Sequence, residues 1–534
     1  MCEIWYILYM ENEVTIDSLI IENAALKAEL AEVNQKLSWL MEQISGNRRK
    51  LYGSSSEKGA YTGTQITFFE EDTGEPLLLE LSPQTDQSPF KGKPRKRGEM
   101  SSRLPANLPI ESIECSLPDS EQECPKCGTH MTVIGKEVAR RELKIIPAKA
   151  IITEYVRNTY GCRVCERNEI TPTIIKAPLP PQLIKGSMCS PETLAHIAVQ
   201  KCIMGVPLYR QEHDWRRNGI PIARQTMANW LIRCSEDYLE PLYSELHRRL
   251  LRHKFLHSDE TSLQVLREPG KPPQSKSSMW VYRTSGDAEH PIVFYDYQPD
   301  KKKERPREFL KGFSGFLMTD GYSAYHSLPD DIVVVGCFSH CRRRFENALK
   351  CMKEKDRQGS LASEGMGFCD KLFDIEREIK NCSFEERFNI RKEKAAPVLD
   401  EFFAWLNRVL PHVATKSKLG SAVTYALNQW KYLTRYLLDG RIEISNNRAE
   451  RSVKSFVINR KNFLFATSVA GARSTAIYHT LTETAKENGL NPYEFLTYIF
   501  HAVIEFDINK DINFVDSLLP ENAPDCCKAI IQMN

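Results

Sequence analysis

The sequence predicts a mixed α/β core that is interrupted by a helical insertion and preceded by a coiled coil and a small cysteine-bracketed domain. Short apolar runs typical of β-strands recur over residues 253–345, and long helical patterns without a strand signal follow over 346–440. A heptad repeat lies near the start of the chain, and two Cys-x-x-Cys pairs follow it. A chain of 534 residues is too long for one core, so several domains are expected.

The heptad repeat runs through residues 14–45. Apolar side chains, with one asparagine among them, recur at two interleaved seven-residue spacings: Ile16, Asn23, Leu30, Leu37 and Ile44, and Leu19, Leu26, Val33 and Leu40. This repeat favours a coiled coil, in which Asn23 would select a two-stranded register. An amphipathic helix that packs on its own domain is the alternative.

Two Cys-x-x-Cys pairs bracket the stretch Glu142–Tyr160, which is rich in β-branched residues. The first pair is Cys124 and Cys127, and the second is Cys162 and Cys165. Two such pairs around strands predict a structural Zn²⁺ site of the ribbon type. Four unrelated buried thiols are the alternative. The remaining cysteines form no small-domain framework, which favours a reducing cytosol over a disulfide scaffold.

The charge of the chain is balanced overall and uneven along its length. There are 72 Lys and Arg against 70 Asp and Glu, so the global charge says little about partners. Residues 49–108 are poor in apolar side chains and predict a flexible linker. Its basic end could lie along DNA phosphates or act only as a tether, and its candidate contacts are Lys93, Arg95, Lys96 and Arg97.

Residues 176–252 predict helices. Ser190 followed by Pro191 is typical of a helix start, because Ser caps the first turn and Pro is tolerated there. The stretch 219–233 resembles a turn followed by a recognition-type helix. A plain helical hairpin is the alternative.

Three acidic residues stand where one metal centre would need them. Asp259 and Asp320 each come at the polar end of an apolar, strand-like run, and Glu450 stands at the start of a basic helix. Two-metal phosphoryl transfer needs carboxylates that converge from separate elements, and hard divalent cations prefer oxygen ligands. The spacing suits two neighbouring strands joined through a meander, with the glutamate supplied by a helix. We expect these three side chains to hold Mg²⁺ or Mn²⁺.

Each acid also has an ordinary structural explanation. Asp259 and Asp320 fit turn chemistry at strand ends, and Glu450 fits a capping box with Asn447. Glu260 is a rival ligand to Asp259, and strand alternation would turn one of the two away. The three acids together, beside basic clusters, favour the metal centre.

Several motifs resemble those of the insertion sequence 66 family of transposases, of the Asp-Asp-Glu type. The matching stretches are HSDET (257–261), TDGYSAY (319–325), CFSHCRRRF (337–345), ISNNRAERSVK (444–454), KNFLF (461–465), GAR (471–473) and NPYEF (491–495). The motif at 337–340 departs from the more usual Cys-Trp-Ala-His in its two middle residues. The resemblance covers nearly the whole chain. It implies a ribonuclease-H-like core with the triad Asp259, Asp320 and Glu450, and a zinc-binding domain at the four paired cysteines.

The resemblance further implies a DNA transposase that cuts the ends of its element and joins them to target DNA. Arg448, Arg451 and Lys454 would hold phosphates, and His340 would support the metal ligands. The expected partners are double-stranded DNA at the element ends and the target, a second copy in a homodimer or larger assembly, and possible accessory proteins of the same element. We expect no membrane and a location in the bacterial cytoplasm, on the nucleoid.

Two other functions fit parts of the sequence. A catalytically inactive DNA-binding regulator derived from such an element would need only the zinc module, the helical pair and the coiled coil. A zinc-ribbon nuclease for RNA would share the metal ions but not the need for a paired complex.

These signals divide the chain into eight predicted segments. They are an N-terminal helix or coiled coil (1–48), a flexible basic linker (49–108), a zinc-binding domain (109–175), a helix-turn-helix-like region (176–252), the catalytic core strands (253–345), the helical insertion (346–440), the catalytic glutamate helix with completion of the core (441–486) and a C-terminal helical tail (487–534).

Overall fold

The computed structural model describes residues 23–27, 33, 150–161, 174–506 and 512–529. The chain divides into two compact units, of which the smaller is Leu77–Leu179 and the larger comprises the rest. Of the predicted coiled coil, residues 23–27 and 33 are described, and they are helical. No helix in the described part of the chain is both long and apolar enough to cross a bilayer.

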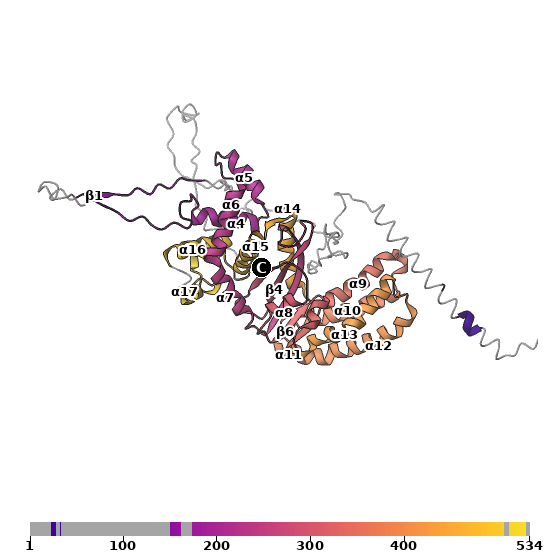
Figure 1. Ribbon diagram of the computed structural model, residues 1–534. Coiled ribbons are helices and arrows are strands. Elements are labelled where there is room, and N and C mark those ends of the chain that lie inside the picture. Colours follow the sequence, from indigo (N-terminus) through magenta and orange to yellow (C-terminus); the bar gives the residue numbers. More distant parts are fainter. Residues whose placement is uncertain (1–22, 28–32, 34–149, 162–173, 507–511, 530–534) are drawn as a thin grey trace, which may run out of the picture. The chain divides into compact units, whose positions relative to one another are not determined.

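The larger unit is built on a mixed six-stranded sheet, labelled in Figure 1. The strands are β3 (Phe255–Arg267), β4 (Lys276–Thr284), β5 (Val293–Gln298), β6 (Gly315–Thr319), β7 (Ile332–Gly336) and β8 (Ala466–Ser468). Their order is β5-β4-β3-β6-β7, and β8 pairs with the far end of β3. The first three strands form an antiparallel meander, whereas β6 and β7 run parallel to β3. The predicted meander and the predicted adjacency of the two acid-bearing strands are both confirmed.

Strand alternation assigns the two faces of the sheet to different helices. On β4, Met279 and Val281 pack with Phe456 of the helix α14 (Asn447–Phe463). Trp280 and Tyr282 point to the opposite core, where the ring of Tyr282 stacks on Phe309 at 3.8 Å. Because neighbouring side chains of a strand point to opposite faces, a sheet with buried residues at every position must be covered on both sides.

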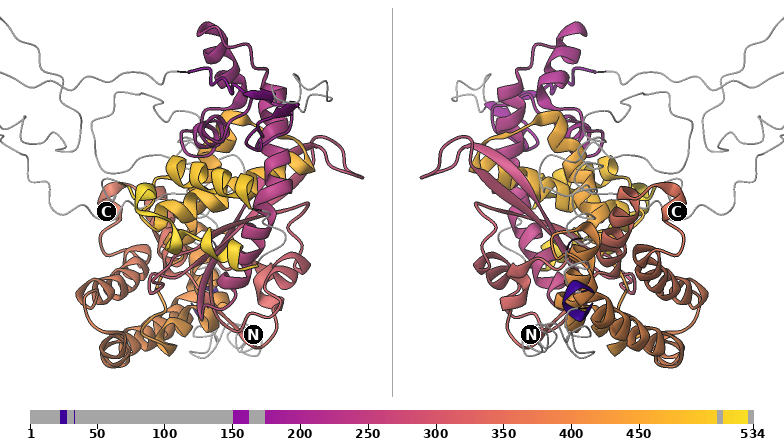
Figure 2. Two further views of the ribbon diagram at one scale, coloured as in Figure 1. Left: turned by 90° about the vertical axis from the view of Figure 1, so that its left-hand side faces the viewer. Right: turned by 90° about the vertical axis from the view of Figure 1, so that its right-hand side faces the viewer.

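Helices from both ends of the larger unit pack together around this sheet, as Figures 1 and 2 show. The preceding helices are α4 (Pro191–Cys202), α5 (Leu208–Arg217), α6 (Arg224–Cys234) and α7 (Glu240–Leu250), and the following ones are α14, α15 (Val469–Glu487), α16 (Pro492–Glu505) and α17 (Ile512–Ser517). The Ser190 side chain caps α4 as predicted, by accepting from the Thr193 backbone N–H at 3.2 Å. The predicted turn and helix at 219–233 are also present, because Gly219 has a positive φ of 78° and α6 follows.

The predicted helical insertion is helical throughout its ordered elements. It consists of α10 (Leu361–Glu378), α11 (Phe384–Ile390), α12 (Ala396–Val409) and α13 (Lys418–Leu433), and it follows α9 (Phe338–Cys351). The helices α9, α10, α12 and α13 share one aromatic core around Phe402 and Trp405, to which α11 contributes no residue. They gather in one bundle in Figure 2, and α13 packs on β7. Along the chain, a short helix, α8 (Glu304–Phe309), connects β5 to β6.

The described part of the smaller unit contains one antiparallel pair, β1 (Thr159–Gly161) and β2 (Ile174–Lys176). The stretch Glu142–Tyr160 was expected to be rich in strands, and this is wrong for residues 150–158, which are exposed and form no strand. Ile152 and Val156 are 92% and 85% exposed. Their β-branched side chains satisfy local preference, but a strand also needs a partner, and none faces these residues in the described part of this unit.

Candidate active site

Asp259 lies inside the longest strand rather than at its end. β3 continues past it to Arg267 and pairs with β4 as far as Gln264. The expectation of a strand end was therefore wrong for this residue. Leu263 and Val265 explain the difference, because they alternate toward the core beneath α14 and extend the buried face of β3.

Asp320 follows β6 directly and sits on a tight turn. Its Oδ1 accepts from the Tyr322 backbone N–H at 2.9 Å, and its carbonyl accepts from the Tyr425 hydroxyl at 3.0 Å. Gly321 has φ 94°, and a Cβ there would lie 3.1 Å from Oε1 of Gln429. Only glycine adopts this conformation without strain, so the turn that aims Asp320 depends on it.

Glu450 lies in the first turn of α14, with a side chain that is 2% exposed. The start of this helix is attached to β3 by Asn446, which is fully buried. The Asn446 Nδ2 donates to the Ser258 carbonyl at 2.8 Å, and its Oδ1 is 3.2 Å from His257 Nδ1. The helix has no side-chain cap, so the capping-box explanation of Glu450 is wrong.

The three predicted acids lie close enough to influence one another. Burial raises the pKa of Asp259 well above its ordinary value, and the charges of Asp320, Glu260 and Glu450 raise it further. The Glu260 backbone N–H, which donates to Asp259 Oδ1 at 2.8 Å, acts in the opposite direction. The structure thus brings together residues from β3, the end of β6 and α14. Clustered carboxylates repel one another unless a proton or a cation intervenes, and their oxygens are the ligands that Mg²⁺ and Mn²⁺ prefer. The residue types suit such ions, but among the described residues the oxygens of these three acids do not all lie within 4.8 Å of one another, so a bound ion would have to draw them closer.

Glu260 occupies the opposite face of β3 from Asp259, as alternation predicts. Its Oε2 accepts from the Tyr325 hydroxyl at 3.0 Å, and Lys301 Nζ lies 3.7 Å from its Oε1. Burial and the charge of Asp320 raise the pKa of Glu260 to about 7, although Lys301 and Tyr325 lower it. Glu260 is therefore a fourth acid near Asp320, held by partners of its own.

Two residues of α9 hold Glu450. The Arg343 guanidinium lies 3.3 Å from Glu450 Oε2, and His340 Nδ1 lies 3.6 Å from Glu450 Oε1. His340 thus stands beside a predicted metal ligand, where a supporting role was expected. Burial lowers the pKa of His340, but the neighbouring Cys337 and the charge of Glu450 together raise it to about 10.

Sequence reasoning did not identify Arg343 or Asn446 as residues that position the site. One signal was available for each. Arg343 follows His340 by three residues, which places both on one helical face. Asn446 stands immediately before the helix that carries Glu450, where a buried amide can join two elements.

The predicted phosphate contacts on α14 form one stripe at three-residue spacing. Arg451 is exposed, Lys454 is half-buried, and Arg448 is paired with Glu443. Burial, with the nearby charges of Arg448 and Arg283, lowers the pKa of Arg451. This stripe is a concentration of positive charge on the helix that carries Glu450.

Some predicted site residues lie outside the described residues. They are the linker cations Lys93, Arg95, Lys96 and Arg97, and the zinc cysteines Cys124, Cys127, Cys162 and Cys165.

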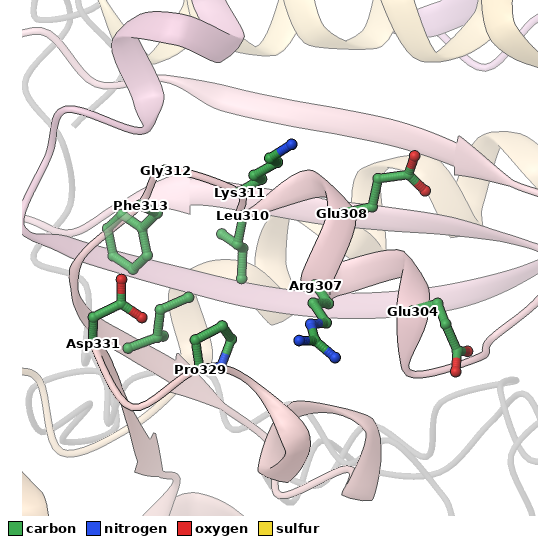
Figure 3. A pocket seen from close by; sticks show the side chains of 10 residues that line it. Glu304, Arg307, Glu308, Leu310, Lys311, Gly312, Phe313, Pro329 and Asp331 are labelled. Carbon is green, nitrogen blue, oxygen red and sulfur yellow. The ribbon is translucent and has the colours of Figure 1, made fainter.

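A cavity of about 460 Å³ lies apart from the acids, next to α8. Figure 3 shows its lining, which includes the charged residues Glu304, Arg307, Glu308, Lys311 and Asp331. None of the predicted site residues lines this cavity. The chemistry expected from the sequence therefore belongs to the acid cluster.

Three family models match the chain. The model described as "Transposase IS66 family" matches residues 186–474, which include all three acids. The "zinc-finger binding domain of transposase IS66" matches residues 121–166, which include all four paired cysteines and support a structural Zn²⁺. The model described as "Transposase C of IS166 homeodomain" matches residues 39–113, most of which the sequence predicts to be linker.

Full-length relatives and one solved structure are also similar. The uncharacterized protein y4qI of Sinorhizobium fredii (strain NBRC 101917 / NGR234) is 30% identical over 96% of this chain and 94% of its own. The uncharacterized protein y4jD of the same strain is 29% identical over 93% and 97%. The Drosophila P element transposase strand transfer complex aligns at 13% identity over 55% of this chain and 92% of that chain. Its TM-score of 0.30 is too low to indicate a shared fold.

The family model covers more than half of the chain, and of the sequence motifs that carried the resemblance all but NPYEF (491–495) lie within it. The chain belongs to the IS66 family of transposases.

Proposed function

We propose that this protein is a DNA transposase in which Asp259, Asp320 and Glu450 hold a pair of Mg²⁺ or Mn²⁺ ions. One observation carries the proposal: Asp320 and Glu450, which are remote from Asp259 in sequence, lie near enough to this buried acid for their charges to raise its pKa. Membership of a transposase family supports it.

We also propose that the core is ribonuclease-H-like. Its support is the topology, in which an antiparallel three-strand meander continues into two parallel strands in the order β5-β4-β3-β6-β7. In this arrangement an acid on the central β3 and an acid after its parallel neighbour β6 lie side by side. A helix beyond the insertion then reaches the same place.

When bound, a pair of divalent ions activates water and stabilises the charge that develops on a phosphodiester. The protein's own residues supply the geometry. Arg343 holds one oxygen of Glu450, and Asn446 fixes the start of α14 against β3. Arg451 and Lys454 would contact DNA phosphates, together with Arg448 once its pairing with Glu443 is exchanged for a phosphate.

The proposed reaction has two steps. Water attacks a phosphodiester at the element end, which leaves a free 3′-hydroxyl on the element. That hydroxyl then attacks a phosphodiester of the target DNA, so that one P–O bond forms as another breaks. The proposed partners are double-stranded element ends and target, a second copy paired through the coiled coil, and accessory proteins of the same element.

Metal-dependent nicking of labelled element ends tests the proposal. We expect Asp259→Asn, Asp320→Asn and Glu450→Gln each to abolish nicking and strand transfer while DNA binding is retained. Asp331→Asn is the matched control, because Asp331 is an exposed acid at the start of β7. Its activity should equal that of the wild type.

Two outcomes would overturn the proposal. Activity that survives the Asp259 and Asp320 changes would exclude this metal centre. Wild-type protein that binds element ends but never cuts them, with either ion, would indicate a DNA-binding regulator instead. Parallel assays on RNA of the same sequence would reveal an RNA nuclease.

A further inference from the structure

Cys337, His340 and Glu450 form a second cluster of metal-ligating atoms beside the proposed magnesium pair. One ligand atom of each lies within 4.8 Å of the other two. Cys337 immediately precedes α9 and His340 lies in its first turn, so their three-residue spacing puts both on one face. Glu450 approaches this face from α14.

Two atoms of the cluster are buried without hydrogen-bond partners. They are Glu450 Oε1 and His340 Nδ1, which lie 3.6 Å apart. A buried polar atom without a partner is costly, and such atoms often mark an ion or water site. Zinc–ligand bonds of about 2.0–2.3 Å at a tetrahedral angle require ligand separations of about 3.3–3.6 Å. The histidine and glutamate are thus already spaced for one ion.

Other contacts fix the second carboxylate oxygen of Glu450 and the sulfur of Cys337. Glu450 Oε2 is held by Arg343 at 3.3 Å, which leaves Oε1 directed at the cluster. Cys337 is fully buried, and its Sγ accepts from the Asn446 backbone N–H at 3.1 Å. A backbone N–H at sulfur is a typical support for a metal-bound thiolate.

We propose that Cys337 Sγ, His340 Nδ1 and Glu450 Oε1 bind a thiophilic divalent ion, for which Zn²⁺ is the best candidate. Sulfur, nitrogen and oxygen ligands select zinc-like ions over magnesium. A thiolate and a carboxylate neutralise its charge, and one tetrahedral position remains for water or phosphate. This site is distinct from the structural zinc of the four paired cysteines.

The site shares Glu450 with the proposed magnesium pair. If the proposed function holds, Zn²⁺ bound here takes Glu450 away from Asp259 and Asp320 and inhibits DNA cleavage. The binding itself does not depend on that function.

Metal analysis of the full-length chain tests the proposal. After equilibration with Zn²⁺ and removal of loosely bound ion, wild type should hold one more zinc per chain than Cys337→Ser or His340→Gln. Cys341→Ser is the matched control, because Cys341 is a buried thiol of the same helix that contacts Cys369 instead. It should keep the wild-type zinc content. Serine preserves the hydrogen-bond acceptor for Asn446, and circular dichroism checks the fold of each variant.

Co²⁺ provides a second readout. The thiolate-to-cobalt absorption of the wild type should fall by the contribution of one sulfur in Cys337→Ser and remain unchanged in Cys341→Ser. Equal zinc content and equal cobalt spectra in wild type and both ligand variants would overturn the proposal. Where one ligand variant does not fold, the other decides.

Inhibition is measured separately. Zn²⁺ should reduce Mg²⁺-dependent nicking by the wild type at a concentration at least about tenfold lower than for Cys337→Ser, each relative to its own rate without zinc; this ratio corresponds to about 1.4 kcal/mol. An absence of nicking in every sample would count against the proposed function and leave the zinc-binding result intact.

Discussion

The side-chain amide of Asn446 donates to the carbonyl of Ser258 at 2.8 Å, across the whole helical insertion. Ser258 immediately precedes Asp259 on β3, and Asn446 immediately precedes the helix that carries Glu450. This buried hydrogen bond therefore attaches the start of the helix that carries Glu450 to β3, next to Asp259.

Replacement of Asn446 by alanine should weaken both the fold and the site. Loss of its amide leaves the Ser258 carbonyl and His257 Nδ1 buried without this partner, at a cost of about 2–4 kcal/mol. Urea unfolding measures this change. Asn407→Ala is the control, because Asn407 is exposed and bonds only within its own helix, and it should change stability by less than about 0.5 kcal/mol. Equal effects of the two substitutions would contradict the proposed role of Asn446.

Gly321→Ala should destabilise the turn that aims Asp320. A side chain at φ 94° costs about 1–2 kcal/mol, and the new Cβ would approach Gln429 Oε1. Gly367→Ala is a control of opposite sign, since Gly367 lies inside α10 with nothing near its Cβ position. It should stabilise by about 0.5–1 kcal/mol. Thermal unfolding compares the two. A Gly321→Ala protein as stable as the wild type would show that the turn tolerates a side chain.

His479 should make the protein sensitive to acid. It is fully buried between Tyr295 and Phe456, and neither ring nitrogen has a hydrogen-bond partner. Burial, with the charges of Lys201 and Lys486, lowers the pKa of His479 from 6.5 to about 3. Below pH 6.5, therefore, His479 binds a proton in the unfolded chain but stays neutral in the folded chain.

His479 therefore lowers the free energy of unfolding by about 1.4 kcal/mol for each unit that the pH falls, from pH 6.5 down to the folded-state pKa of about 3. His479→Leu should remove that slope and stabilise the protein at neutral pH by about 1–3 kcal/mol, since two unpaired buried nitrogens disappear. His501→Leu is the control, because His501 is exposed and bonds to Glu192. Urea unfolding at several pH values gives the slopes. The same acid slope in His479→Leu and wild type would disprove this assignment.

Mg²⁺ should stabilise the protein more at high pH than at low pH. The pKa of Glu260 is raised from 4.5 to about 7, so its contribution to stability is full below pH 4.5 and is lost as pH rises through 7. The pKa of Asp259 is raised in the same direction. A cation at the cluster offsets the repulsion between the ionised carboxylates, which is greater at high pH. The Mg²⁺-induced rise in Tm should therefore be larger at about pH 8 than at about pH 6.

Glu260→Gln tests the source of this pH dependence. It should reduce the difference between the two pH values, whereas Glu401→Gln, on an exposed helical face, should not. A Tm shift that is independent of pH in the wild type would show that ionisation of Glu260 and Asp259 does not affect binding of the ion.

Strands with continuous apolar runs could be predicted, and strands with alternating polarity only in part. The runs at Met279–Tyr282 and Ile332–Val335 mark β4 and β7, because both of their faces are buried. The second half of β3 was not predicted, because Gln264 interrupts the apolar residues Leu263 and Val265 and the period-2 pattern there is short. As a result Asp259 was placed at a strand end.

The sequence could name candidate site residues, but it could not name the residues that support them. Asp259, Asp320 and Glu450 stand in recognisable local settings of strand, turn and helix start. Nothing local indicates that Arg343 reaches Glu450 or that Asn446 reaches Ser258, since each contact joins elements that are remote in the chain.

The sequence by itself determined the family, the order of strands and helices, and the acids suited to bind metal, because residue type and spacing act locally. Only the tertiary structure decided that Asp259 lies near Asp320 and Glu450, whose charges raise its pKa, while Glu260 contacts Tyr325 and Lys301. It alone placed Cys337 and His340 against Glu450. The physical reason is that long-range packing brings α9 and α14 together over β3, and no local pattern encodes that meeting.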